Sequence, residues 1–187
     1  ILKDNIGFGV SNSFIRPLGS DKPFDGLNPS GVFFDELHAF KPHNRDFFNT
    51  MVTGSGSRRQ PLQIAITTAS DEKGYLYHEE ADYCRGVVAD EFQDQALFGM
   101  IFELDETDDP FDPNFDVQTL KKSNPGLNVS VKPEYLQAQL KEAINKPAAK
   151  NRFLRYHGNV CVSSLSSVIN LEDYDAAAGE LSDWREA

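Results

Sequence analysis

Two adjacent carboxylates, Asp35 and Glu36, are the side chains whose type and spacing best suit chemistry. They follow the apolar run Val32, Phe33 and Phe34, which is typical of a buried strand in a parallel sheet. Open α/β sheets bind their ligands beyond the carboxyl ends of such strands. One acid could hold a hard cation while the other deprotonates an attacking water, as nucleoside triphosphate hydrolysis requires. A strand that simply ends in two solvated acids is the alternative, because short motifs often match by chance.

A second apolar run, residues 62–69, is predicted to be a strand that ends in the two hydroxyls of Thr67 and Thr68 and in the small Ala69. If this run is a strand beside the first one, Thr67 and Thr68 arrive at the same edge as the acids. A hydroxyl there could sense a terminal phosphate through its water and pass the change to the next segment. The alternative is that threonine is present only because it favours strands.

Three further residues near these strands could contact phosphate. Arg58 and Arg59 lie in a Gly- and Ser-rich loop, residues 53–61, and the planar guanidinium keeps its charge and donates paired hydrogen bonds to phosphoryl groups. A solvated pair on a loop is the alternative. His38 could contact a phosphate or order a neighbouring acid, but a lone histidine beside an apolar face is more often a satisfied packing residue, which is the interpretation we favour.

The apolar spacing predicts a sheet half followed by a mainly helical half. Short strands or a hairpin are expected in residues 6–10 and 13–15, and a third buried strand in residues 95–104. The acids that follow, from Glu103 to Asp109, are predicted to form a solvated loop. Helices are predicted over the following ranges: 44–52, 71–91, 115–122, 133–145, 148–157 and 171–178.

Composition limits the classes of protein to consider. With 187 residues, 40% of them hydrophobic, the chain can form an ordinary globular core. A formal net charge of −11 argues against the uniformly basic surface of a stand-alone nucleic-acid binder, so any contact with DNA is expected to be local or to need help from missing parts. Cys84 and Cys161 have no metal-ligand or redox spacing and are expected to be reduced.

Targeting signals are not apparent in the sequence. No apolar run approaches the roughly 18 residues of a membrane-spanning helix, and no charged segment followed by an apolar one opens the chain, so we expect a cytosolic protein. The chain opens at Ile1 without an initiator methionine and closes at Ala187 without a final structural element. We therefore expect it to be a piece of something longer.

Several of these pieces occur in an order that resembles a known family. Residues 25–39, the Arg58-Arg59 pair and residues 66–69, together with residues 123–127 and 151–153, resemble the large terminase subunit of tailed bacteriophages. The resemblance runs from about residue 10 to about residue 175 and rests on the order and spacing of several motifs. It implies an additional-strand P-loop ATPase, with Mg²⁺ as cofactor and ATP as substrate, followed by a ribonuclease-H-like endonuclease domain.

The resemblance also implies roles for individual residues. Asp35 looks like the Walker B carboxylate that holds Mg²⁺, and Glu36 looks like the catalytic glutamate. Thr67, Thr68 and Ala69 look like the motif that couples hydrolysis to movement. The basic pair Arg58 and Arg59 precedes that motif, and a trans-acting catalytic role for either arginine is our own hypothesis. The implied partners are double-stranded DNA, the portal protein, the small terminase subunit and further copies in a ring, without a membrane, in the cytoplasm of the infected bacterial host.

The sequence departs from the family pattern in three respects. It contains no Gly-x-x-x-x-Gly-Lys-Ser/Thr segment, the phosphate-cradling loop of the fold, and no further strand that could supply the metal-binding acids of the nuclease. Gly158 and Cys161 are smaller than the residues more usual at their positions. We interpret the chain as part of a motor that is inactive alone; a fragment of a helicase-type P-loop motor and a non-catalytic docking module for portal or capsid proteins are the alternatives.

The expected fold class is α/β: a partial P-loop NTPase sheet of the RecA-like type with flanking helices, then a helical arm and a linker. We expect residues 1–105 to form the second half of the ATPase core and residues 106–160 the helical arm. Residues 161–187 are expected to form a linker toward the nuclease domain.

Overall fold

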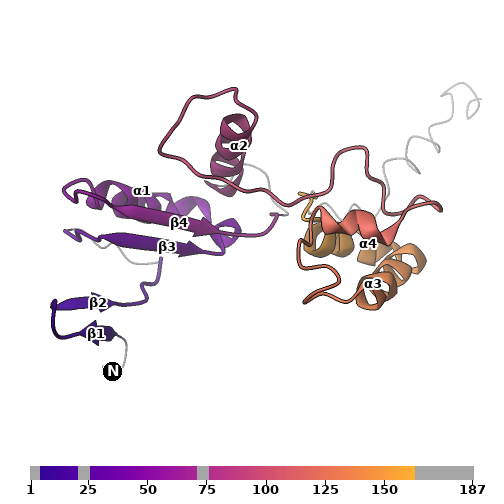
Figure 1. Ribbon diagram of the computed structural model, residues 1–187, viewed down its shortest axis with the longest axis horizontal. Coiled ribbons are helices and arrows are strands. Elements are labelled where there is room, and N and C mark those ends of the chain that lie inside the picture. The colour runs from indigo at the N-terminus through magenta and orange to yellow at the C-terminus, as the bar shows by residue number, and fades with distance from the viewer. Residues whose placement is uncertain (1–4, 21–25, 71–75, 163–187) are drawn as a thin grey trace, which may run out of the picture. The chain divides into compact units, whose positions relative to one another are not determined.

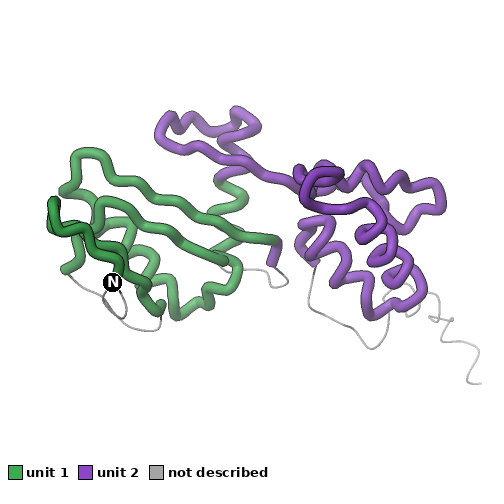
Figure 2. The backbone as a smooth tube through the Cα atoms, turned by 60° about the horizontal axis from the view of Figure 1, so that its bottom comes forward, with its two compact units in different colours: residues 1–68, 74–83 green, residues 69–73, 84–187 purple. Residues whose placement is uncertain are grey.

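The computed structural model describes residues 5–20, 26–70 and 76–162. Two compact units divide the chain, and Figure 2 colours them separately. Residues 1–68 and 74–83 form unit 1, and residues 69–73 and 84–187 form unit 2. Small sheets and several helices make the chain a mixed α/β protein, as predicted.

A parallel strand pair with a crossover helix forms the centre of unit 1 (Figure 1). Strand β3 (Gly31–Asp35) pairs with β4 (Leu62–Ile66), and the register runs from Gly31 opposite Leu62 to Asp35 opposite Ile66. Helix α1 (Arg45–Gly54) connects the strands after two short 3₁₀ turns, Leu37–Ala39 and Pro42–Asn44. The helix predicted over residues 44–52 is therefore confirmed.

Apolar side chains pack α1 against one face of this strand pair. The rings of Phe34 and Phe48 lie 4.6 Å apart between their centroids, and Met51 completes the contact at 2% exposure. Burial of such side chains contributes roughly 1.5–3 kcal/mol each. Phe33 and Ile66 remain 64% and 61% exposed, so the expectation of a strand buried on both faces is wrong for the described residues. Helix α1 covers a single face, so alternate strand residues keep their exposure.

A hairpin precedes the parallel pair. Strand β1 (Ile6–Phe8) pairs antiparallel with β2 (Ser13–Ile15), and Asn12 takes a left-handed φ of 51° in the turn. Asparagine tolerates that conformation better than most residues. Among the described residues these two strands form a sheet of their own and do not join β3 and β4.

Helix α2 (Leu76–Val88) lies within the helix predicted over residues 71–91, of which residues 71–75 are outside the described part. The strand predicted over residues 95–104 is wrong, because this described segment contains no strand, and Phe98 and Met100 are 84% and 63% exposed. Its end bonds instead to the end of a helix: the Leu104 N–H donates to the Gly158 carbonyl at 3.0 Å. A short apolar run does not reveal whether a neighbouring strand exists to pair with it.

Unit 2 has a helical core. It contains the 3₁₀ helix Val117–Lys121, α3 (Pro133–Asn145), α4 (Pro147–Phe153) and a π-helical turn, Leu154–Gly158. Proline at the first position of α3 and α4 suits a helix start, because that N–H needs no intrahelical partner. The buried core residues are Leu104, Leu120, Leu127, Leu136, Leu140, Ala143, Ala149 and Phe153.

The helices predicted over residues 133–145 and 148–157 are thus confirmed, the second as α4 with its π-helical continuation, and the one over residues 115–122 appears as a 3₁₀ helix. The helix predicted over residues 171–178 lies outside the described residues. Within the described part of the chain, no helix is both long and apolar enough to cross a membrane.

Candidate functional site

The carboxyl ends of β3 and β4 bring the predicted acids and hydroxyls to one edge of unit 1. Asp35 is the last residue of β3 and lies opposite Ile66, the last residue of β4, so Thr67 and Thr68 leave the sheet beside Glu36. The expectation that these strands are parallel neighbours is confirmed. Hence this edge, formed by Asp35, Glu36, Thr67 and Thr68 and called the β3 edge below, presents carboxylate and hydroxyl oxygens at the place where α/β sheets bind ligands.

Glu36 has an unusual backbone conformation at this edge. Its φ of 54° and ψ of 53° lie in the left-handed region, which is rare for residues other than glycine. The conformation turns the chain from β3 into the 3₁₀ turn, where the Ala39 N–H donates to the Glu36 carbonyl at 2.8 Å. Its side chain is 56% exposed, with Oε2 3.1 Å from His38 Nδ1. Strained backbone of this kind occurs at functional sites, and here it accompanies the contact of the Glu36 carboxylate with His38.

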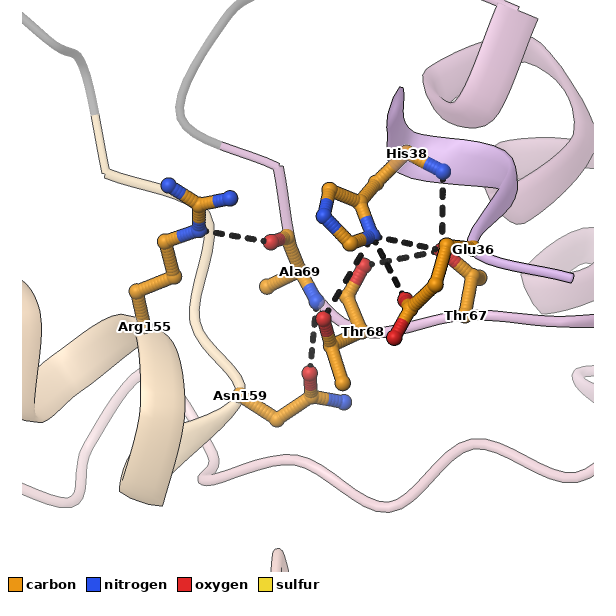
Figure 3. Close-up of polar contacts among 7 residues, drawn as sticks. All are labelled: Glu36, His38, Thr67, Thr68, Ala69, Arg155 and Asn159. Carbon is orange, nitrogen blue, oxygen red and sulfur yellow. Dashed lines mark hydrogen bonds and ion pairs between the residues drawn. The ribbon is translucent and has the colours of Figure 1, made fainter. Parts of the chain in front are cut away.

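His38 connects the acid to the hydroxyls, as Figure 3 shows. Its backbone N–H donates to Thr67 Oγ1 at 2.9 Å, and Thr67 Oγ1 donates to the Thr68 carbonyl at 3.1 Å. The ring Nδ1 lies 3.1 Å from the Glu36 carboxylate and 3.3 Å from Thr67 Oγ1. Because Nδ1 carries at most one hydrogen, the nearer carboxylate is its main acceptor.

These contacts fit the alternative that His38 orders a neighbouring acid. A satisfied packing residue, the role that the sequence favoured, also has polar partners, so these contacts are compatible with both roles. His38 is nevertheless a residue beside this edge that sequence reasoning undervalued. Its position two residues after Glu36, across a tight turn, is the signal that could have revealed it.

The two arginines lie in the loop before β4. Both are exposed, and the Arg58 guanidinium donates through Nε to the Asn28 carbonyl at 3.0 Å. Within the described part of the chain, no hydrogen bond or ion pair joins Arg58 or Arg59 to the acids of the β3 edge. The structure therefore brings together the acids and hydroxyls but not the arginines.

Ala69 is held differently from the two threonines before it. It is fully buried and belongs to unit 2, where the Asn159 Oδ1 accepts from its N–H at 2.7 Å. Its carbonyl accepts from Arg155 Nε at 3.1 Å, and Figure 3 shows both side chains reaching this one residue. Asn159 and Arg155 lie 90 and 86 positions further along the chain, so no local pattern pointed to them.

The acidic run between Glu103 and Asp109 is used for structural bonds. Glu103 Oε2 lies 2.8 Å from Arg85, and Lys122 Nζ lies 2.7 Å from Asp108 Oδ2 while also bonding Asp105. The hydrogen bond from Lys122 lowers the pKa of Asp108, and the two aspartates raise the pKa of Lys122. This agrees with the predicted loop. In the described ranges, no group of three or more His, Cys, Asp or Glu residues could hold a metal ion.

The β3 edge has the donor chemistry that Mg²⁺ requires. Carboxylate and hydroxyl oxygens are hard ligands, and Mg²⁺ at phosphate sites uses one or two carboxylates together with water and substrate phosphates. A closed cage of protein ligands is therefore not needed. Asp35 is exposed at the strand end, and Glu36, Thr67 and Thr68 are exposed or partly exposed beside it, which is compatible with this kind of open site.

The fold and this edge define an α/β protein of the kind that binds ligands at the carboxyl ends of parallel strands. Two family profiles match the chain: "Terminase large subunit, ATPase domain" over residues 1–86 and "Terminase large subunit, endonuclease domain" over residues 91–184. The chain belongs to the terminase large subunit family.

Two known proteins are similar to this chain. Protein YmfN of Escherichia coli (strain K12) is 37% identical over 154 residues, which are 81% of this chain and 32% of that protein. The crystal structure of the HK97 bacteriophage large terminase superimposes with a TM-score of 0.66 at 22% identity, covering 88% of this chain and 33% of that one. The chain thus spans about a third of the length of these relatives, and the second match supports the fold alone.

Proposed function

We propose that the complete protein hydrolyses ATP with Mg²⁺ and uses the energy to package double-stranded DNA into procapsids. The observation that carries this proposal is the pairing of β3 with β4, which puts Asp35 and Thr67 at the ends of adjacent parallel strands. Membership of the terminase large subunit family supports the same activity. ATP hydrolysis needs an edge of this kind, with one carboxylate for the cation and another for the nucleophile.

Asp35 is proposed to hold Mg²⁺, and Glu36 to orient the attacking water and take its proton on a carboxylate oxygen. When bound, Mg²⁺ neutralises charge on the phosphates of the substrate. His38 keeps the Glu36 side chain in place through the contact between Nδ1 and Oε2. Because Glu36 is exposed at this edge, a water molecule can reach its carboxylate directly.

Arg58 and Arg59 are proposed as candidates for an arginine that completes the site of a neighbouring copy. Both arginines are exposed and precede the amino end of β4, whereas Asp35 lies at the carboxyl end of β3, and this arrangement supports action in trans. Thr67, Thr68 and Ala69 are proposed to couple hydrolysis to movement. Alanine substitution of each arginine tests the first proposal, because unchanged turnover of both variants in the assembled ring would reject it.

The 187 residues contain no Gly-x-x-x-x-Gly-Lys-Ser/Thr segment, so we propose that this chain alone neither binds ATP tightly nor hydrolyses it. We propose that residues 1–105 include the second half of the ATPase core, residues 106–160 a helical arm and residues 161–187 a linker. Residues 84–105 belong to unit 2, and the endonuclease-domain profile starts at residue 91, so unit 1 is the part that supports the ATPase assignment. An endonuclease activity is proposed for the complete protein.

The proposed partners are double-stranded DNA, the portal protein, the small terminase subunit and further copies of the chain in a ring, in the cytoplasm of the infected bacterial host. Family membership supports these partners. A net charge of −11 requires that contact with DNA be local or come from other parts of the assembly.

The test is steady-state ATP turnover by the complete protein with Glu36→Gln, with Glu106→Gln as the matched control in the acidic run. Loss of a positioned base costs about 10²- to 10⁴-fold in rate, so Glu36→Gln is expected to lower turnover by at least roughly 100-fold while ATP binding persists. Glu106→Gln is expected to match the wild type. Equal turnover in both variants would refute the assignment, and ATP-independent binding to portal protein would favour a docking module instead.

A further inference from the structure

We infer that Asn159 and Arg155 are positioning residues that grip the backbone of Ala69 and so pass movement of the coupling segment to the helical core of unit 2. This inference rests on the proposed function. Neither residue belongs to a motif that the sequence singled out. We refer to Ala69 with its two partners, Asn159 and Arg155, as the Ala69 clamp.

Asn159 is chemically suited to this position in two ways. It follows the π-helical turn with φ 53° and ψ 34°, and asparagine tolerates left-handed backbone better than most residues. Its side-chain amide accepts from the Ala69 N–H at 2.7 Å and donates to the Phe102 carbonyl at 2.9 Å. The amide offers an acceptor on one side and a donor on the other, whereas the ionised carboxylate of an aspartate could make only the first bond.

Arg155 closes the other side of the same residue. Its Nε donates to the Ala69 carbonyl at 3.1 Å, so both polar backbone groups of Ala69 bond to side chains. Ala69 has 0% exposure, and a buried backbone group that loses its partner keeps the full cost of its desolvation. A displacement of Ala69 in either direction along the chain would therefore break or stretch one of these two hydrogen bonds.

The residues that carry the clamp are themselves anchored to the core of unit 2. The His157 carbonyl, inside the π-helical turn, accepts from Ser123 Oγ at 2.6 Å and from Asn124 Nδ2 at 2.7 Å. Asn124 Nδ2 also donates to the carbonyl of Leu120, a residue with 0% exposure in the core. π-Helical turns recur at functional sites. A displacement of Ala69 is thus passed to packed helices, which move as rigid bodies.

The position of the clamp along the chain indicates a role in coupling. Within unit 1, Thr67 accepts from His38, whose ring holds the Glu36 carboxylate. The next unit begins at Ala69, one residue after Thr68. A shift of the threonines on loss of a phosphate is therefore delivered through one peptide bond to a residue held by Asn159 and Arg155.

The experiment compares ATP turnover with DNA packaging by the complete protein in its assembled ring. Asn159→Gly keeps the left-handed backbone and deletes both side-chain bonds, whereas Asn159→Asp keeps the acceptor for Ala69 and loses the donor to Phe102. Arg155→Ala removes the second side of the clamp. Asn128→Gly is the matched control, because Asn128 also has a left-handed φ, of 69°, and its side chain bonds Gln118 instead.

Base pairs packaged per ATP hydrolysed should fall at least fivefold in Asn159→Gly and Arg155→Ala, while ATP turnover stays within twofold of the wild type. Asn159→Asp should lie between these variants and the wild type, and Asn128→Gly should match the wild type. A residue with only a structural role would lower turnover and packaging in parallel, so a parallel fall or an unchanged ratio overturns the inference. If Asn159→Gly does not fold, Asn159→Asp and Arg155→Ala decide the matter.

Hydrogen exchange of the Ala69 amide in the 187-residue chain separates the clamp from the proposed function. Exchange should be at least tenfold faster in Asn159→Gly than in Asn128→Gly, because only the first loses the acceptor of that N–H. Equal exchange in the two variants overturns the clamp itself. Absence of ATP turnover in the wild-type complete protein would overturn the proposed function and the coupling role. The exchange result would then still show whether Asn159 bonds the Ala69 N–H, because that measurement does not depend on ATP turnover.

Discussion

Two acidic regions of the chain look alike in sequence and are used in opposite ways. Asp35 and Glu36 lie at the end of a strand and are exposed, and the Glu36 carboxylate lies 3.1 Å from His38 Nδ1. The acids from Glu103 to Asp109 form structural bonds: Glu103 pairs with Arg85, and Asp105 and Asp108 share Lys122. A run of acids is therefore informative about function only when its position in the fold is known.

The largest expected effect contrasts Asp35→Asn with Asp105→Asn. In the complete protein, Asp35→Asn should reduce Mg²⁺-dependent ATP turnover by roughly 100-fold or more, because the substitution removes the proposed metal ligand, and the metal stabilises charge in the transition state. Asp105→Asn should change turnover by less than about twofold, since Lys122 keeps its second partner, Asp108. Steady-state kinetics over a range of Mg²⁺ concentrations measures both. An equal loss in the two variants would remove the distinction between the regions.

A smaller effect is expected for stability, and here the substitution in the acidic run should matter more than the substitution at the β3 edge. Glu103→Gln should lower the free energy of unfolding by about 1 kcal/mol, because it weakens a charge-assisted pair whose members are 35% and 30% exposed. Glu36→Gln should change it by about 0.5 kcal/mol or less, since its carboxylate is 56% exposed. Urea unfolding of the 187-residue chain followed by circular dichroism compares the two. A larger loss at Glu36 would mean that its carboxylate is structural.

A change of about fivefold in turnover is expected for His38→Ala. The ring holds Glu36 at 3.1 Å and Thr67 at 3.3 Å, so its loss leaves the proposed base present but less well oriented. His43→Ala is a control in the neighbouring 3₁₀ turn. Turnover by His38→Ala equal to that of His43→Ala would show that His38 does not position Glu36.

The smallest effect is a dependence of stability on pH at Asp108. Its pKa is lowered below the ordinary 3.8 by the Lys122 hydrogen bond, so the stabilisation is complete above that value and is lost as the pH falls through the lowered pKa. The difference in stability between the wild type and Lys122→Met should therefore shrink between pH 6 and pH 2. Thermal unfolding at several pH values measures it, and a difference that grows on acidification would contradict the assignment.

Much of the fold could be predicted because its signals are local. Pro133 and the apolar spacing after it specify α3, and the runs at Gly31–Asp35 and Leu62–Ile66 specify the parallel pair. The segment 95–104 was wrongly predicted as a strand, because a strand requires a partner that the segment itself does not encode. Its exposed Phe98 shows that the same apolar composition can occur without a ladder.

The site could be predicted only in part for the same reason. Asp35, Glu36 and the threonines follow strands, so their position at one edge follows from the parallel arrangement. The bond from His38 to Thr67 joins residues 29 positions apart, and that from Asn159 to Ala69 joins residues 90 positions apart. Such contacts depend on how elements pack, which periodicity does not specify.

The most direct measurement maps the cation itself. Fe²⁺ is substituted for Mg²⁺ in the complete protein with ATP, peroxide is added, and the backbone positions cleaved by the radicals formed at the metal are identified by mass spectrometry. We predict ATP-dependent cleavage at residues 35–38 and 67–68, abolished by Asp35→Asn. ATP-dependent cleavage confined to residues 103–109, or cleavage at the β3 edge that persists in Asp35→Asn, would contradict the assignment of this edge as the magnesium site.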